Sequence, residues 1–243
     1  MNFLRSRFAT LSDSRETLDS ILRLPGRRVL GNTSKAIAIL SYPRSGNHLV
    51  RGLLEATLRY PSIVGYDGNQ ADPPIFLWPD KLESPFIHKF HSVGHLLTQS
   101  EGYLSRVIVT TRPPADAISS HASREAIPTF RGLASMIRDR GLRSLRSEYA
   151  AWNDIQLFAK ETTLPVLNLQ FENLLPPEKL FESYQRICTF LDLEEDLRLS
   201  YTDVCNVADY TKRIQASAPN NFITSRYRHM VRSRLQNLEL TSN

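Results

Sequence analysis

The chain has few cysteines and no long apolar stretch. Cys188 and Cys205 are its two cysteines, and no CxxC spacing typical of zinc or redox sites occurs. We therefore expect two buried thiols in helices, with no disulfide or metal site. No run of 18 or more apolar residues is present, and residues 1–16 lack the apolar core of a secretion signal. These absences predict no transmembrane anchor and favour a cytoplasmic location.

Lysine is scarce among the basic residues. Six lysines among 30 basic residues leave 30 − 6 = 24 arginines, and the formal net charge is +5. The planar guanidinium group suits phosphate and sulfate, so the bias favours an anionic partner. The same bias arises in a GC-rich genome, and the charge does not choose between a nucleotide, a nucleic acid and a membrane surface.

Apolar strands alternate with amphipathic helices along most of the chain. The pattern predicts strands over 35–42, 86–90, 106–111 and 165–171, and helices over 47–59, 92–100, 115–123, 130–144, 147–161 and 177–191. Residues 1–30 are expected to form a prefix with a short helix over 13–24, and residues 194–243 a polar helical part. Residues 60–85, rich in proline and aromatic residues, are expected to form a long loop that shapes a substrate pocket or merely covers the surface.

This alternation predicts a single α/β domain over 1–243. Its core would be a three-layer arrangement with a mostly parallel central sheet and helices on both faces, similar to a P-loop NTPase. Ligands bind such sheets at the carboxyl ends of the strands. Polar clusters at 42–48, 89–91 and 112–120 follow three of the strands, so we expect them to converge on one site.

The first cluster joins a buried strand to a helix through Ser41-Tyr-Pro-Arg-Ser-Gly-Asn47. A strand–helix turn presents backbone N–H groups at the positive end of a helix, which suits a bound phosphate or sulfate. Gly46 lets the backbone approach the anion, Ser45 and Asn47 add polar groups, and Arg44 adds a permanent charge. The Walker A pattern GxxxxGK[ST] is absent. Taken alone, the turn also fits a purely structural connection.

This segment resembles the 5′-phosphosulfate loop of sulfotransferases that use 3′-phosphoadenosine-5′-phosphosulfate (PAPS), written TYPKSGTTW or SYPRSGNTW. The resemblance implies that Arg44 bridges to the sulfate. It also implies that Ser45, Gly46, Asn47 and His48 cradle the 5′-phosphate, with His48 at the position of a threonine.

A second segment, Arg112-PPADAISS-Ser120, resembles the family's 3′-phosphate segment RNPKDVAVS with the same spacing from arginine to serine. An arginine at a strand end and a serine in the following helix can hold one phosphate from two sides. The resemblance therefore implies that Arg112 and Ser120 bind the 3′-phosphate. Alone, Arg112 would be read as a solvated arginine.

A third segment, Lys89-Phe90-His91, is similar to the family's KTH segment. The resemblance implies that His91 is the general base and Lys89 a cation near the transferred group. Residues two apart on a strand share a face, which would let both act together. Histidine suits a general base because its pKa lies near neutrality.

The C-terminal part keeps less of the family pattern. The family's closing loop, RKGxxGxW, corresponds only loosely to residues 221–228, where Arg226 is the candidate to contact the nucleotide. Residues 166–175 resemble a strand followed by the family's YEDLL segment.

Together these resemblances imply sulfuryl transfer from PAPS to an acceptor hydroxyl of a carbohydrate, lipid or small alcohol, without a metal. No nucleic-acid partner is expected, and the oligomeric state stays open. Two alternatives are a P-loop-like small-molecule or nucleotide kinase, which would need a loop lysine and Mg²⁺ ligands, and an inactive nucleotide-binding module. The arginines between 226 and 234 leave nucleic-acid binding as a weaker third reading.

Overall fold

The computed structural model describes residues 36–60, 62–64, 75, 87–100, 103–125 and 141–216. The expected N-terminal helix over 13–24, residues 130–140 of the helix expected over 130–144, most of the loop over 60–85 and the C-terminal part beyond 216 lie outside these residues. The separate helices expected over 130–144 and 147–161 need correction, because one helix runs without a break over Gly141–Glu161. All structural statements below concern the described part of the chain.

A five-stranded parallel sheet forms the centre of the fold. Its order is β2-β3-β1-β4-β5, and every neighbouring pair is parallel. The strands are β1 (Ala36–Ser41), β2 (Ser62–Val64), β3 (Ile87–Phe90), β4 (Leu104–Thr111) and β5 (Val166–Gln170). The four predicted strands are therefore confirmed. The short β2 corrects the expectation that residues 60–85 form only loop, because three residues are too few for an alternating pattern to show.

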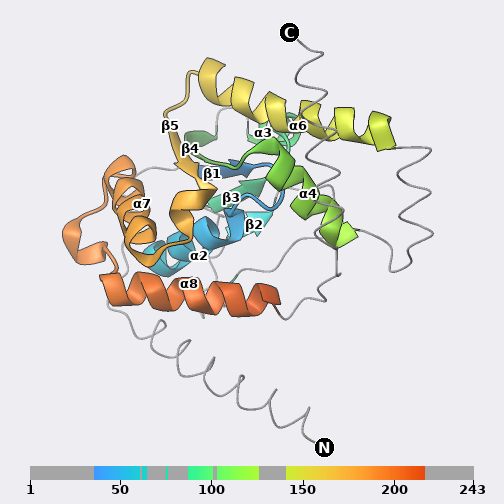
Figure 1. Cartoon of the computed structure of the whole chain (residues 1–243). Helices are drawn as coiled ribbons and strands as arrows, with labels where there is room; N and C mark the ends of the chain where they lie inside the picture. Colours follow the sequence, from blue (N-terminus) through green and yellow to red (C-terminus); the bar gives the residue numbers. More distant parts are fainter. Residues whose placement is uncertain are drawn as a thin grey trace, which may run out of the picture.

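Helices cover both faces of the sheet, as Figure 1 shows. Side chains of β1 at alternate positions enter two separate apolar clusters, one on each face. One cluster includes α2 (Asn47–Leu58), α7 (Pro177–Phe190) and α8 (Tyr201–Ala216), and the other includes residues of α3 (Val93–Ser100), α4 (Pro114–Glu125) and α6 (Gly141–Glu161). The predicted three-layer α/β fold is confirmed.

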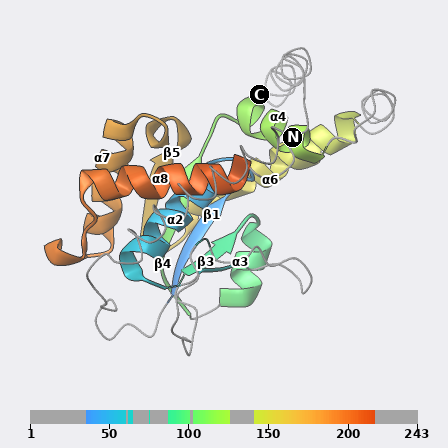
Figure 2. The same ribbon diagram turned by 90° about the horizontal axis from the view of Figure 1, so that it is seen from below.

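Helix α2 lies between the sheet and α8, which crosses in front of it in Figure 2. A side chain at Gly52 would meet Thr211 Oγ1 of α8 at 2.5 Å, so glycine permits this close approach. As a result almost every residue of α2 is buried. The turn between β1 and α2 is therefore attached to a helix that is packed into the core.

The two cysteines are free thiols. Cys188 on α7 is buried, and burial raises the pKa of its thiol. Cys205 on α8 is partly exposed, which corrects the expectation that both are buried. No described helix is long and apolar enough to span a membrane.

Candidate anion-binding site

The turn between β1 and α2 has a backbone that depends on glycine. Arg44 and Gly46 adopt left-handed conformations, with φ of 66° and 90°. A side chain on Gly46 would meet Leu174 Cδ1 at 2.9 Å and Phe171 Cδ2 at 3.0 Å. Both the conformation and the space therefore require glycine at this position. Phe171 and Leu174 belong to the short helix η2 (Phe171–Leu174), which follows β5. The segment that resembles YEDLL therefore packs against the turn at Gly46.

Helix α2 begins at this turn without a side-chain cap or an acidic residue in its first turn. Its first N–H groups and the positive end of its dipole therefore remain suited to an external anion. Buried beside them, Ser45 Oγ and Asn47 Oδ1 have no hydrogen-bond partner among the described residues. Buried polar atoms are nearly always paired, so these two indicate that a polar ligand or water belongs here.

Two arginines from different segments meet at the turn. Arg112, which directly follows β4, donates from Nη1 to the backbone carbonyl oxygen of Arg44 at 3.2 Å. Arg44 donates from Nε to Ser120 Oγ of α4 at 3.4 Å, a long contact on an exposed surface. The residues expected to hold the two ends of a nucleotide thus lie together at the carboxyl ends of β1 and β4.

Arg112 is held at its side chain by Phe171 and at its backbone by Trp152. Its central carbon lies 4.4 Å from the centroid of the Phe171 ring, which is close enough for a cation–π contact. The carbonyl oxygen of Arg112 accepts a hydrogen bond from Trp152 Nε1 of α6 at 2.9 Å. The sequence identified neither residue as part of the site, because both are far from Arg112 along the chain.

His91 lies just beyond β3, next to the end of β1. Its Nδ1 is 2.7 Å from the backbone carbonyl oxygen of Ser41. A carbonyl oxygen only accepts, so Nδ1 carries the proton in this contact. In a neutral ring the lone pair then lies on Nε2. The contact fixes the tautomer that a base acting through Nε2 needs.

Lys89 occupies β3 opposite Ile39 of β1, and it is buried, with 1% of its surface exposed. It shares a face with Ile87, on the side of α2, whereas His88 stacks on Phe90. Since β3 ends at Phe90, strand alternation does not extend to His91. His91 is placed by its bond to the Ser41 carbonyl oxygen, and its action together with Lys89 stays a prediction.

Two further residues, His48 and Arg226, were expected at the site. His48 lies partly buried in the first turn of α2. Arg226 lies outside the described residues. Among the described residues, no group of three or more histidines, cysteines, aspartates and glutamates is arranged to hold a metal ion.

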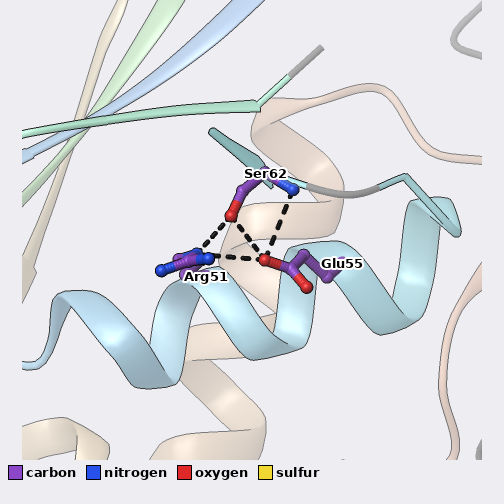
Figure 3. Close-up of polar contacts among 3 residues, drawn as sticks. All are labelled: Arg51, Glu55 and Ser62. Atoms are coloured by element: carbon purple, nitrogen blue, oxygen red, sulfur yellow. Dashed lines mark hydrogen bonds and ion pairs between the residues drawn. The ribbon is translucent and has the colours of Figure 1, made fainter. Parts of the chain in front are cut away.

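A buried polar cluster farther along α2 was not predicted from the sequence. Arg51 Nε and Glu55 Oε1 form an ion pair of 3.0 Å with both side chains fully buried. Ser62 of β2 completes the cluster through hydrogen bonds from Arg51 to its hydroxyl and from its hydroxyl to Glu55 (Figure 3). The i, i+4 spacing of Arg51 and Glu55 is visible in the sequence, but it also describes an exposed helix face.

Of the comparisons with known proteins, the one with solved structures gives matches. No family model and no curated protein matches the sequence. Among solved structures, the chain is similar to mouse sulfotransferase SULT7A1 complexed with PAP, at 17% identity and a TM-score of 0.48, over 85% of this chain and 72% of that one.

Two structures of retinol dehydratase are also similar, both at 18% identity and over 82% of this chain. The complex with androsterone and inactive cofactor PAP has a TM-score of 0.44 and is covered over 68% of its length. The complex with retinol and PAP has a TM-score of 0.41 and is covered over 69%.

Proposed function

We propose that this protein is a PAPS-dependent sulfotransferase that transfers a sulfuryl group to an acceptor hydroxyl of a carbohydrate, lipid or small alcohol. The observation that carries the proposal is the meeting of Arg44, Arg112 and Ser120 at an uncapped helix start. Two permanent cations from separate strands at one turn suit a ligand with two anionic groups.

The residues present fit such a ligand. Ser45 Oγ and Asn47 Oδ1 are buried without partners among the described residues, and Gly46 permits the left-handed backbone of the turn that packs against Phe171 and Leu174. In the proposed complex, the turn and the first N–H groups of α2 hold the 5′-phosphate end of the nucleotide. Arg112 and Ser120 hold its 3′-phosphate. The cofactor is a co-substrate, consumed and replaced in each turnover.

The proposed chemistry needs a cation at the leaving group. As the acceptor oxygen bonds to sulfur, the bond from sulfur to the phosphate oxygen breaks and that oxygen keeps the electron pair. Arg44 and the N–H groups of α2 stabilise this growing charge more than the ground state, which lowers the barrier. Buried Lys89 on the neighbouring strand would add a further positive charge.

The acceptor hydroxyl loses its proton as it attacks, and we assign His91 as the base that takes it. The contact between His91 Nδ1 and Ser41 directs the lone pair to Nε2, which receives the proton. Because Ser41 Oγ also accepts from Asn47 Nδ2 at 2.9 Å, one residue links the base to the anion-binding turn. Replacing His91 with alanine should lower kcat by 100-fold or more, as about 10²–10⁴-fold is typical for a general base. Unchanged turnover would exclude this role.

The kinase alternative is disfavoured by the turn itself. A kinase of the P-loop type places a lysine directly after the glycine, where this chain has Asn47. Calorimetric titration with 3′-phosphoadenosine-5′-phosphate (PAP), and with ATP in the presence and absence of Mg²⁺, separates the two. We expect micromolar binding of PAP and much weaker binding of Mg²⁺·ATP.

Variants make the titration specific. Arg44→Ala and Arg112→Ala should each weaken PAP binding, while Arg186→Ala serves as a matched control, because Arg186 is an exposed arginine on α7, outside the segments assigned to the nucleotide. Preference for Mg²⁺·ATP would support the kinase, and binding of PAP without turnover of PAPS would support the inactive module. If the wild type binds neither nucleotide, the proposal is wrong.

A further inference from the structure

Helix α6 contacts both anion-binding segments through residues one helical turn apart. Trp152 donates from Nε1 to the Arg112 carbonyl oxygen at 2.9 Å. Glu148 accepts a hydrogen bond from the hydroxyl of Tyr42, the residue that leads into the anion-binding turn. Figure 1 shows α6 above the sheet, next to α4. Positions four apart lie on one helix face, so a single face of α6 reaches both segments.

The hydrogen bond from Trp152 is made to a peptide group that has no N–H donor of its own. Arg112 is followed by Pro113 and Pro114, so the peptide after Arg112 has no N–H group, and its carbonyl oxygen is its hydrogen-bonding atom. Fixing that carbonyl fixes the plane of the peptide and, with it, the direction in which the Arg112 side chain leaves the backbone. Phe171 then supports the guanidinium group from its face.

The bond from Tyr42 anchors the other segment. Tyr42 is buried, with 2% of its surface exposed, and His121 of α4 lies edge-on to its ring at 5.8 Å between centroids. The hydroxyl group of a buried tyrosine needs a partner, and Glu148 supplies a charged acceptor. The position of the turn relative to α6 is thereby set by a side-chain hydrogen bond in addition to strand pairing.

We propose that Glu148 and Trp152 are positioning residues that hold the two anion-binding segments at a fixed separation. Neither residue is assigned a contact with the ligand: Trp152 acts through Arg112, and Glu148 acts through Tyr42. The inference rests on the proposed function, because it takes Arg112 as the 3′-phosphate ligand and the turn as the 5′-phosphate ligand. It predicts that the two residues affect different ends of the nucleotide.

The test compares PAP with adenosine 5′-phosphate, which lacks the 3′-phosphate. Trp152→Phe keeps an aromatic ring and removes the N–H donor. It should raise the Kd for PAP by roughly 3- to 10-fold, as expected for one neutral hydrogen bond, and leave the Kd for adenosine 5′-phosphate within about 2-fold. Phe158→Leu on the same helix, which also trims an aromatic side chain in this apolar layer, should leave the ratio of the two Kd values unchanged.

Glu148 gives the complementary result. Glu148→Leu should weaken binding of both nucleotides by a similar factor of about 3 to 10, because both contain the 5′-phosphate. Glu148→Gln keeps an acceptor oxygen for Tyr42 and should restore most of the affinity. A purely structural role would lower the unfolding temperature and leave both Kd values at those of the wild type.

The outcomes separate the two levels of the proposal. If the wild type prefers PAP and Arg112→Ala loses this preference while Trp152→Phe keeps it, the positioning role of Trp152 is wrong and the proposed function stands. If Glu148→Gln binds as weakly as Glu148→Leu, the positioning role of Glu148 is wrong. If the wild type shows no preference for PAP, the assignment of Arg112 fails and the inference fails with it.

Discussion

Arg44 and Arg51 stand seven residues apart, one in the turn before α2 and the other inside that helix. Arg44 is exposed and contacts a serine hydroxyl at 3.4 Å. Arg51 is fully buried and forms an ion pair with Glu55, completed by Ser62 (Figure 3). The turn before α2 thus presents an exposed arginine, whereas the helix itself encloses one.

The enclosed part continues toward the end of the helix. Thr57 Oγ1 lies 3.1 Å from the hydroxyl oxygen of Tyr184 on α7, which also accepts a hydrogen bond from the Leu199 N–H group at 2.7 Å. Burial raises the pKa of Tyr184 above its ordinary value, with the nearby Cys188 thiol as a smaller cause. Glu55, Thr57 and Tyr184 all have internal partners, whereas Ser45 Oγ and Asn47 Oδ1 at the turn have none among the described residues.

The difference indicates where stability and binding reside. A buried charge with its partner removed costs several kcal/mol, so the enclosed cluster constrains the fold. An exposed arginine contributes little to folding and keeps its charge available for a ligand. The same residue type therefore has opposite expected responses to mutation in the turn and in the helix that follows it.

Breaking the enclosed pair should have the largest effect on folding. Arg51→Ala leaves the Glu55 carboxylate buried without its cation, and we expect the free energy of unfolding to fall by about 3–5 kcal/mol. Urea denaturation followed by circular dichroism measures this. The double replacement Arg51→Met with Glu55→Leu removes both charges and should recover much of the loss. A loss below about 1 kcal/mol in Arg51→Ala would contradict the contrast.

Removing an open arginine should affect binding instead. Arg44→Ala or Arg112→Ala should weaken PAP binding by roughly 10- to 100-fold, as expected for a charged hydrogen bond. For Arg44→Ala, which removes an exposed charge, the free energy of unfolding should change by less than about 1 kcal/mol. Calorimetry and urea denaturation on the same samples check both values. Equal losses of stability in Arg44→Ala and Arg51→Ala would remove the distinction between the two regions.

Gly46 lies where the two regions meet, so its replacement should affect both properties. Gly46→Ala places a side chain at φ of 90° and against Leu174 and Phe171. We expect a loss of about 1–2 kcal/mol in stability together with weaker PAP binding. Gly94→Ala in α3 is the matched control, since its new side chain would meet Ser92 Oγ at an ordinary 3.5 Å. A fully stable Gly46→Ala variant would show that the turn tolerates a side chain.

The smallest expected effect is a pH dependence of the enclosed part. Tyr184 holds its proton more tightly in the folded protein than in the unfolded chain, whose tyrosine pKa is about 10. Its contribution to stability is present below pH 10 and is lost as the pH rises above it, because the unfolded chain then releases the proton first. Unfolding free energies between pH 8 and 11 should therefore fall more steeply for the wild type than for Tyr184→Phe. Parallel curves would contradict this assignment.

Much of the fold was predictable because its signals are local. The buried strands around 36–41 and 104–111 are short apolar runs, and α2 and α7 have clear helical periodicity. The edge strand β2 was missed because Ser62–Val64 is too short for a pattern and pairs with β3 across the long intervening segment. The single-domain assignment over 1–243 and the roles of the site residues, including His91 and Lys89, stay predictions.

The candidate site was predictable only in part. Arg44, Gly46 and Arg112 belong to motifs that a reader can find in the chain, since each motif directly follows an apolar strand. Phe171 and Trp152 carry no such signal: an aromatic residue after a strand or on a helix face usually indicates core packing. They contact Arg112 because β5 lies beside β4 and α6 packs over the sheet.

The sequence by itself determined four of the five strands, their alternation with helices and the residue types of the turn between β1 and α2, because backbone preferences and apolar periodicity act over a few residues. Only the tertiary structure decided which arginine is open and which is enclosed. The environment of Arg51 depends on β2 and α8, and that of Arg112 on η2 and α6, all distant along the chain. Burial and pairing of a charge are properties of the assembled layers, and they decide whether an arginine stabilises the fold or remains available to a ligand.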